Sequence, residues 1–98
     1  MHVILWQFEP KPGKDREFEM AYGPGGEWAW LFARSPEYRG TELLRPTDSN
    51  RYMTVDRWTS AAAYDAFRER WQEEYESLDR RCEILTEHEA MIGRFDSA

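Results

Sequence analysis

The sequence feature that most constrains the fold is a long helical pattern near the carboxyl end of the chain. Apolar side chains recur there at steps of three and four residues, at Tyr64, Phe67, Trp71, Tyr75, Leu78, Cys82 and Leu85. Residues at this spacing share one face of an α-helix. The opposite face carries charged side chains, Arg68 among them, and is expected to face solvent. With Thr59 or Ser60 as the cap, the pattern predicts one continuous amphipathic helix reaching Leu85.

Strand and helix signals alternate along the rest of the chain. Segments with strand composition or turn-bounded apolar patterns are residues 2–8, 41–45, 51–58 and 88–95. Residues 14–22 predict a first helix, which the glycines at 23–26 interrupt before helical spacing resumes from Trp28 to Phe32. The order strand, split helix, strand, strand, helix, strand predicts an α+β fold, a ferredoxin-like β-α-β-β-α-β sandwich with an antiparallel sheet.

Length and composition limit the number of domains and the kinds of partner. Ninety-eight residues suit one domain, spanning residues 1–98. A net charge of −6 argues against nucleic acid, whose binding needs a positive field. Cys82 is the only cysteine, which fits a reducing compartment, and we expect the cytoplasm. No segment approaches the roughly 20 apolar residues of a membrane helix, so no membrane association is expected.

The first strand offers apolar side chains to both faces of the sheet. Val3 and Leu5 alternate with Ile4, Trp6 and Phe8. The helices of this topology cover one face only, so the second face needs another cover. A second copy of the sheet, related by two-fold symmetry, is the simplest one, and we therefore expect a homodimer.

The glycine-rich segment at residues 23–26 precedes two tryptophans but does not form a phosphate-binding loop. A dinucleotide fingerprint would need a third glycine where Trp28 stands and would follow a strand. Two interpretations remain: a structural kink, with glycine supplying a positive φ at the end of the first half-helix, or the mobile wall of an apolar pocket. Trp28 lies on the helical stripe, whereas Trp30 lies off it and suits a pocket rim or an interface.

Two titratable residues could take part in catalysis, and no metal site is predicted. Asp56 lies on a strand between aromatic residues, so burial could make it a proton acceptor; alternatively it pairs with an arginine or lies at the wet edge of the sheet. His88 could serve as an acid, a base or a ligand, or be merely structural or exposed. His88-Glu89 begins like a zinc-protease motif, but Ile92 replaces the second histidine.

The region around the third strand resembles the antibiotic biosynthesis monooxygenase (ABM) domain. In the run at residues 52–60, Asp56 and Trp58 match the family's acidic residue, one intervening position and tryptophan before the second helix. Residues 63–67 resemble the start of that helix, and residues 40–45 resemble the family's second strand. The resemblance implies a dimeric α/β barrel in which each subunit keeps a cavity between sheet and helices. Trp58 is shared by members of many functions, so both structural and catalytic roles are open.

The resemblance suggests an activity, because family members include cofactor-independent oxygenases that hold polycyclic phenols with tryptophan, tyrosine and asparagine. The chain's Asn50 falls in a turn. Other members degrade haem with an axial histidine on the second helix, and residues 61–85 contain none. The first hypothesis is therefore a monooxygenase that needs no cofactor and binds a small planar aromatic or quinol. Its predicted substrate-binding residues are Tyr22, Trp28, Phe32, Tyr52, Trp58, Phe67 and Trp71. The alternative is a non-catalytic dimeric module that binds a small apolar ligand or stabilises a partner.

Overall fold

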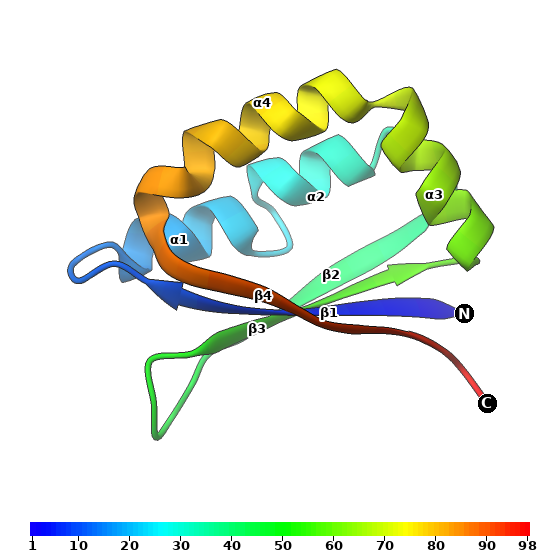
Figure 1. The fold of residues 1–98 in the computed structure, drawn as a ribbon. Coiled ribbons are helices and arrows are strands. Elements are labelled where there is room, and N and C mark those ends of the chain that lie inside the picture. The colour runs from blue at the N-terminus through cyan, green and yellow to red at the C-terminus, as the bar shows by residue number, and fades with distance from the viewer.

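A four-stranded antiparallel sheet with strand order β2-β3-β1-β4 forms one layer of the computed structural model, which describes residues 1–98. The elements are β1 (His2–Pro10), α1 (Asp15–Tyr22), α2 (Glu27–Phe32), β2 (Tyr38–Leu44), β3 (Tyr52–Trp58), α3 (Ala61–Arg70), α4 (Gln72–Cys82), a 3₁₀ turn (Glu83–Leu85) and β4 (Thr86–Asp96). All helices lie on one face of the sheet (Figure 1). This arrangement confirms the predicted ferredoxin-like fold.

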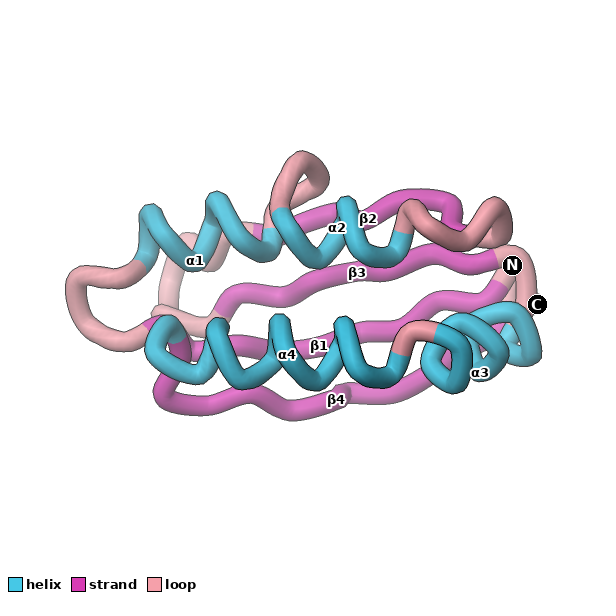
Figure 2. The backbone as a smooth tube through the Cα atoms, turned by 90° about the horizontal axis from the view of Figure 1, so that it is seen from above, coloured by secondary structure: helices cyan, strands magenta, loops and turns pink.

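The helices form a second layer in two rows. Seen from above, α1 and α2 follow one another on the side of β2 and β3, while α4 runs beside them on the side of β1 and β4 (Figure 2). The core between the layers is rich in aromatic residues, and its largest fully buried side chains are Trp58, Phe18 and Ile4. Alternation along β1 and β3 supplies the floor of this core, because every second side chain points toward the helices.

The second helical region is broken at Trp71, where one continuous helix was predicted. Ser60 caps α3 by accepting a hydrogen bond from the backbone N–H of Ala63. Trp71 then leaves the helical conformation, with φ −114° and ψ 28°, before α4 begins. The break lets α3 descend to the end of β3 while α4 runs along the sheet (Figure 1). Periodicity did not reveal it, because the apolar pattern continues in phase on both sides of Trp71.

The glycine segment between α1 and α2 allows close packing of the backbone and has no positive φ angle. The predicted positive φ is therefore wrong there. Gly23 is extended, with φ −74° and ψ 174°. A Cβ atom at Gly26 would collide with the carbonyl oxygens of Met20 and Ala21 in the last turn of α1. The positive φ angles belong instead to Gly13 and Gly40.

The second face of the sheet has no helix over it (Figure 1). Val3 and Val55 lie on this face, where Val3 pairs with Phe95 of β4, and Phe95 is half exposed. Leu44, on the same face of β2, is 43% exposed. β4 is longer than predicted and runs along β1 with a register shift between Leu5 and Trp6. None of the helices combines the length and apolar character that crossing a bilayer requires.

Candidate active site

A cavity of about 290 Å³ lies between the sheet and the helices. Its apolar lining consists of Trp6, Phe8, Tyr22, Trp28, Phe32, Tyr75 and Met91. Its polar lining consists of Thr41, Thr54, Asp56, Arg68, Asp79 and Glu89. Two of these residues, Glu89 and Met91, are exposed, and both belong to β4. The cavity therefore opens to solvent along β4.

The apolar wall is built from aromatic rings held at different inclinations. The ring centroids of Phe8 and Tyr22 lie 4.6 Å apart, and those of Trp28 and Tyr75 lie 4.9 Å apart with the planes at 66°. Such surfaces bind flat, electron-rich rings by stacking and by edge-to-face contact. A volume near the lower end of the roughly 300–1,000 Å³ typical of ligand pockets restricts the ligand to a small molecule.

Asp56 supplies a carboxylate to the floor of the cavity. It lies on β3 and is 7% exposed, so solvent hardly reaches it. Burial raises the pKa of this carboxyl group to about 6, although a hydrogen bond from Thr41 favours the charged form and lowers it. Its hydrogen bond is with the Thr41 hydroxyl at 2.6 Å, and the predicted pairing with an arginine does not occur. The other prediction, the wet edge of the sheet, is also wrong, because β3 is an inner strand.

Arg68 brings a cation to the cavity from α3. Its guanidinium lies over the ring of Tyr75, 3.7 Å from the centroid, and donates to the hydroxyl of Tyr64 at 3.2 Å. Its Nε is buried and has no hydrogen-bond partner. The side chain was predicted to face solvent, but its position four residues after Tyr64 brings it to the edge of the buried stripe. No carboxylate forms an ion pair with Arg68.

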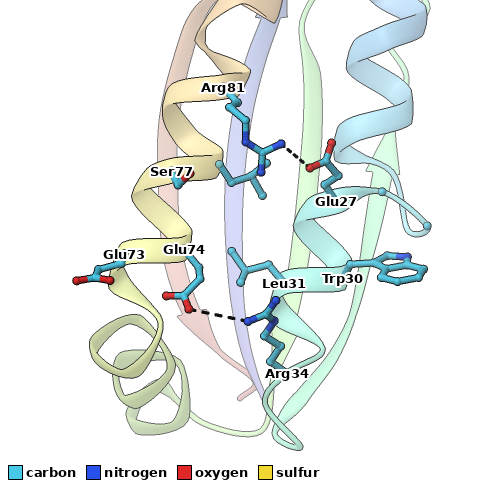
Figure 3. Close-up of a pocket in the computed structure, with 11 residues that line it drawn as sticks. Glu27, Trp30, Leu31, Arg34, Glu73, Glu74, Ser77 and Arg81 are labelled. Carbon is cyan, nitrogen blue, oxygen red and sulfur yellow. Dashed lines mark hydrogen bonds and ion pairs between the residues drawn. The ribbon is translucent and has the colours of Figure 1, made fainter.

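A wider groove of about 750 Å³ lies on the outside, between α2 and α4 (Figure 3). Ion pairs cross it from Arg81 to Glu27 at 2.8 Å and from Arg34 to Glu74 at 3.9 Å. Trp30 is among the residues that line the groove, but its ring points away from α4 and the residue is 75% exposed (Figure 3). Its charged, open walls would leave an aromatic ligand in water, so the inner cavity is the better candidate.

Comparison with known proteins agrees with the fold. The model of the antibiotic biosynthesis monooxygenase family matches residues 1–76. The chain belongs to the ABM family. No curated protein matches the sequence.

Solved ABM-like structures share the fold over almost the whole chain. SnoaB, a cofactor-independent oxygenase from Streptomyces nogalater, is 22% identical with a TM-score of 0.79, covering 99% of this chain and 92% of SnoaB. MhuD, a heme-degrader from Mycobacterium tuberculosis solved with two hemes in its active site, is 22% identical with a TM-score of 0.65, covering 99% of this chain and 95% of MhuD. A NIPSNAP domain protein from Burkholderia xenovorans is 19% identical with a TM-score of 0.72, covering 100% and 95% of the two chains.

The substrate-binding residues predicted from the sequence occupy several parts of this ABM fold. Tyr22, Trp28 and Phe32 line the inner cavity. Trp58 and Phe67 lie in the core beside the cavity, with their rings 5.1 Å apart, and do not line it.

The remaining two predicted residues lie away from the cavity. The hydroxyl of Tyr52 donates to Glu19 at 2.5 Å near the start of β3. The ring of Trp71 lies at the junction of α3 and α4, where the guanidinium groups of Arg34 and Arg70 are each 4.8 Å from its centroid.

Several residues that line the cavity are not indicated by any local sequence pattern. Trp6 and Phe8 line the cavity from β1. The only sequence signal for this is that they point to the same face of the strand as Ile4. Thr41 of β2 lies directly opposite Asp56 of β3. This pairing depends on the register of the two strands, which no local sequence pattern reveals.

Neither histidine of this ABM protein belongs to the cavity lining. His2 is buried at the start of the inner strand β1, with Nδ1 2.7 Å from Asp96 Oδ1. His88 is exposed, with Nε2 3.8 Å from Glu9. No group of three or more His, Cys, Asp or Glu side chains is arranged to hold a metal ion. The cavity therefore offers no imidazole that could bind a haem iron.

Proposed function

We propose that this protein is a cofactor-independent monooxygenase whose substrate is a small planar aromatic with an ionisable hydroxyl, such as a quinol. The observation that carries the proposal is the position of Asp56. This buried carboxylate has a pKa of about 6. It lies in a cavity that is open along β4 and is otherwise lined by six aromatic rings, Met91 and five polar side chains. Belonging to the ABM family and sharing the fold of SnoaB support the reaction class.

Asp56 acts as the base in this proposal. At neutral pH a carboxyl group with a pKa of about 6 is mostly ionised, yet it is a stronger base than an ordinary aspartate. It takes the proton of the substrate hydroxyl and leaves an electron-rich anion between the rings of Tyr22 and Trp28. The apolar wall reduces the access of water to this anion.

The anion then reacts with dioxygen, and the atoms balance without an external reductant. One oxygen atom of dioxygen is inserted into a C–H bond of the ring and becomes the oxygen of a new hydroxyl group. The two electrons lost as the quinol becomes a hydroxyquinone reduce the other oxygen atom to water. This water takes one proton from the second hydroxyl group of the quinol and one from solvent, which replaces the proton that Asp56 accepted. Dioxygen is therefore the only co-reactant.

Arg68 stabilises the negative charge that develops on the substrate. Its guanidinium has no carboxylate partner, and its buried Nε–H is free to donate. A fixed cation in a partly desolvated site stabilises a developing anion more than the same cation would in bulk water. The two polar groups thus have different roles: Asp56 accepts the proton, and Arg68 stabilises the negative charge of the substrate anion.

Among the family's known chemistries, haem degradation is not supported by the donor set of this chain. The heme-degrader MhuD shares the fold, but neither His2 nor His88 lines the cavity here. The proposed reaction uses only groups that do line it.

The uncovered face of the sheet is proposed to pair with the same face of a second copy. Val3, Leu5 and Val55 on this face have no covering helix within the chain (Figure 1). Replacement of Leu5 by Glu places a charge at its centre and should give monomers in sedimentation equilibrium where the wild type sediments as a dimer. Glu69→Lys, at an exposed position of α3 away from this face, is the control. A wild-type monomer at high concentration would contradict the pairing.

Oxygen uptake tests the activity directly. Wild-type protein should consume dioxygen with at least one member of a panel of quinols and anthrones, and ¹⁸O₂ should place one labelled atom in the product. Asp56→Asn should lose roughly 100-fold or more in turnover, because amide nitrogen and oxygen do not accept a proton at neutral pH. Asp48→Asn, in the exposed loop before β3, is the matched control. Bound but unaltered ligand, with no uptake for any compound, would instead indicate a binding module.

A further inference from the structure

We infer that Thr41 and Tyr38 form a proton relay that carries the proton accepted by Asp56 out of the cavity to solvent in a hollow between α2 and the edge strand β2. The inference rests on the proposed function, because it begins with Asp56 acting as a base. It concerns a later step, the return of Asp56 to its ionised form while product or the next substrate fills the cavity.

The three side chains form a continuous chain of short hydrogen bonds. The Thr41 hydroxyl donates to Asp56 Oδ1 at 2.6 Å. The hydroxyl oxygens of Tyr38 and Thr41 are also 2.6 Å apart. Since Thr41 uses its single proton toward Asp56, Tyr38 donates to Thr41 in the resting state. Asp56 makes no other side-chain hydrogen bond or ion pair, so this chain is its only polar connection.

The chain links two separate hollows of the molecule. Thr41 lines the inner cavity and also lines a hollow on the outer surface, of about 400 Å³. Tyr38 lines only the outer hollow, beside Trp30 and Gly40. A proton that moves from Asp56 through Thr41 to Tyr38 therefore leaves the substrate side and reaches water.

A bulge in β2 makes this chain possible. Residues 38 and 41 are an odd number of positions apart and would point to opposite faces of a regular strand. The register shifts so that Tyr38 pairs with Trp58 while Gly40 pairs with Arg57, and one residue is left over. Gly40 has φ +111°, which glycine adopts readily. The extra residue turns Tyr38 back to the face that carries Thr41, and their hydroxyls meet.

Proton transfer along the chain balances at every atom. Protonated Asp56 gives its proton to Thr41 Oγ1, and Thr41 passes its own hydroxyl proton to Tyr38 Oη. Tyr38 releases its phenolic proton to water in the outer hollow. Each hydroxyl gains one proton and loses one, so both end neutral. Burial, partly offset by the hydrogen bond with Thr41, raises the pKa of Tyr38, so its phenol does not remain ionised between transfers.

The relay can be tested without turnover by using para-nitrophenol, a phenol whose anion absorbs visible light. Stopped-flow absorbance reports ionisation of the bound phenol, and a pH indicator in weak buffer reports proton release to solvent. In wild-type protein the two signals should rise together. In Tyr38→Phe and Thr41→Val the phenol should still ionise, but proton release should be roughly 10-fold slower or more. Thr41→Ser keeps the hydroxyl and should restore simultaneous release.

The controls separate the relay from the proposed function and from misfolding. Thr59→Val removes a hydroxyl that donates to Glu37 outside both hollows, and it should release protons as the wild type does. Small amines should accelerate release in Tyr38→Phe, because they take the proton directly, whereas a folding defect would not respond. Wild-type release rates in Tyr38→Phe and Thr41→Val would overturn the relay alone. Failure of wild-type protein to ionise the phenol would overturn Asp56 as the base and the relay with it.

Discussion

Thr41 donates to Asp56 at 2.6 Å from the directly paired position on the neighbouring strand. This hydrogen bond and the burial of Asp56 act in opposite directions on the pKa of the carboxyl group. Burial raises it and the hydroxyl lowers it, and burial is the larger effect, since the pKa is raised from 3.8 to about 6. The result is a carboxylate that is ionised at neutral pH but held in an environment that favours its neutral form.

The folded state should therefore lose stability as Asp56 ionises. Because its folded pKa is above its unfolded value, the folded chain binds the proton more tightly, and stability falls as pH rises from about 4 through about 6. Asp56→Asn removes this loss and should be more stable than wild type above pH 6, by up to about 3 kcal/mol. Urea unfolding at pH 4 and pH 8 measures it. A variant less stable than wild type at pH 8 would contradict the burial of a charged Asp56.

Gly40 should tolerate substitution less well than Gly25, although both have open space where a Cβ would lie. Only Gly40 has a positive φ, so alanine is strained there and not at Gly25. Gly40→Ala should cost about 1–3 kcal/mol of unfolding free energy, measured by urea denaturation. Gly25→Ala should leave stability within about 0.5 kcal/mol of wild type. Equal effects of the two substitutions would argue against the bulge geometry.

Trp28 and Glu27 are neighbours in α2 whose removal should have very different costs. Trp28 is buried at 7% exposure, and truncation to alanine should cost about 3–5 kcal/mol. Glu27 forms an ion pair with Arg81 in which both side chains are about 60% exposed, so Glu27→Gln should cost at most about 1 kcal/mol. Thermal unfolding at low and high salt separates them, because only the ion pair is screened. A large, salt-independent loss in Glu27→Gln would indicate that the groove between α2 and α4 is more than a surface feature.

Tyr52 should influence acid stability through Glu19. Hydrogen bonds from Arg45 and then from the Tyr52 hydroxyl hold the pKa of Glu19 at about 2, below its usual 4.5. This stabilisation is present above about pH 4.5 and is lost as pH falls toward 2. Tyr52→Phe should cost about 1 kcal/mol at neutral pH, and its difference from wild type should shrink in acid. Ligand affinity, measured in parallel, decides whether Tyr52 also binds substrate as the sequence suggested.

The sequence was sufficient for the order of elements but not for details that depend on distant contacts. Spacing of three and four residues identified the helices, and β-branched and aromatic segments identified the strands, because both signals are local. The break at Trp71 left the apolar phase unchanged and so left no local trace. The function of Gly26 depends on the carbonyl groups of α1 that pack against it, and glycine alone does not distinguish a tight approach from a positive φ.

The cavity was harder to predict than the fold. Tyr22, Trp28 and Phe32 could be placed near it because they lie on helical stripes that face the sheet. Thr41 and Arg68 could not, because the importance of Thr41 comes from cross-strand register and that of Arg68 from a position at the edge of a stripe. Arg68 was expected to face solvent only because its side chain is charged.

Val55 and Asp56 are consecutive in β3 and point to opposite faces of the sheet, so a single peptide bond separates the uncovered apolar face from the floor of the cavity. A strand is too thin to insulate one face from the other. If two copies pair through the Val55 face, diluting the protein would release the strand that carries the proposed base. The specific activity of the proposed reaction would then depend on protein concentration, and an assay run far below the cellular concentration would underestimate it.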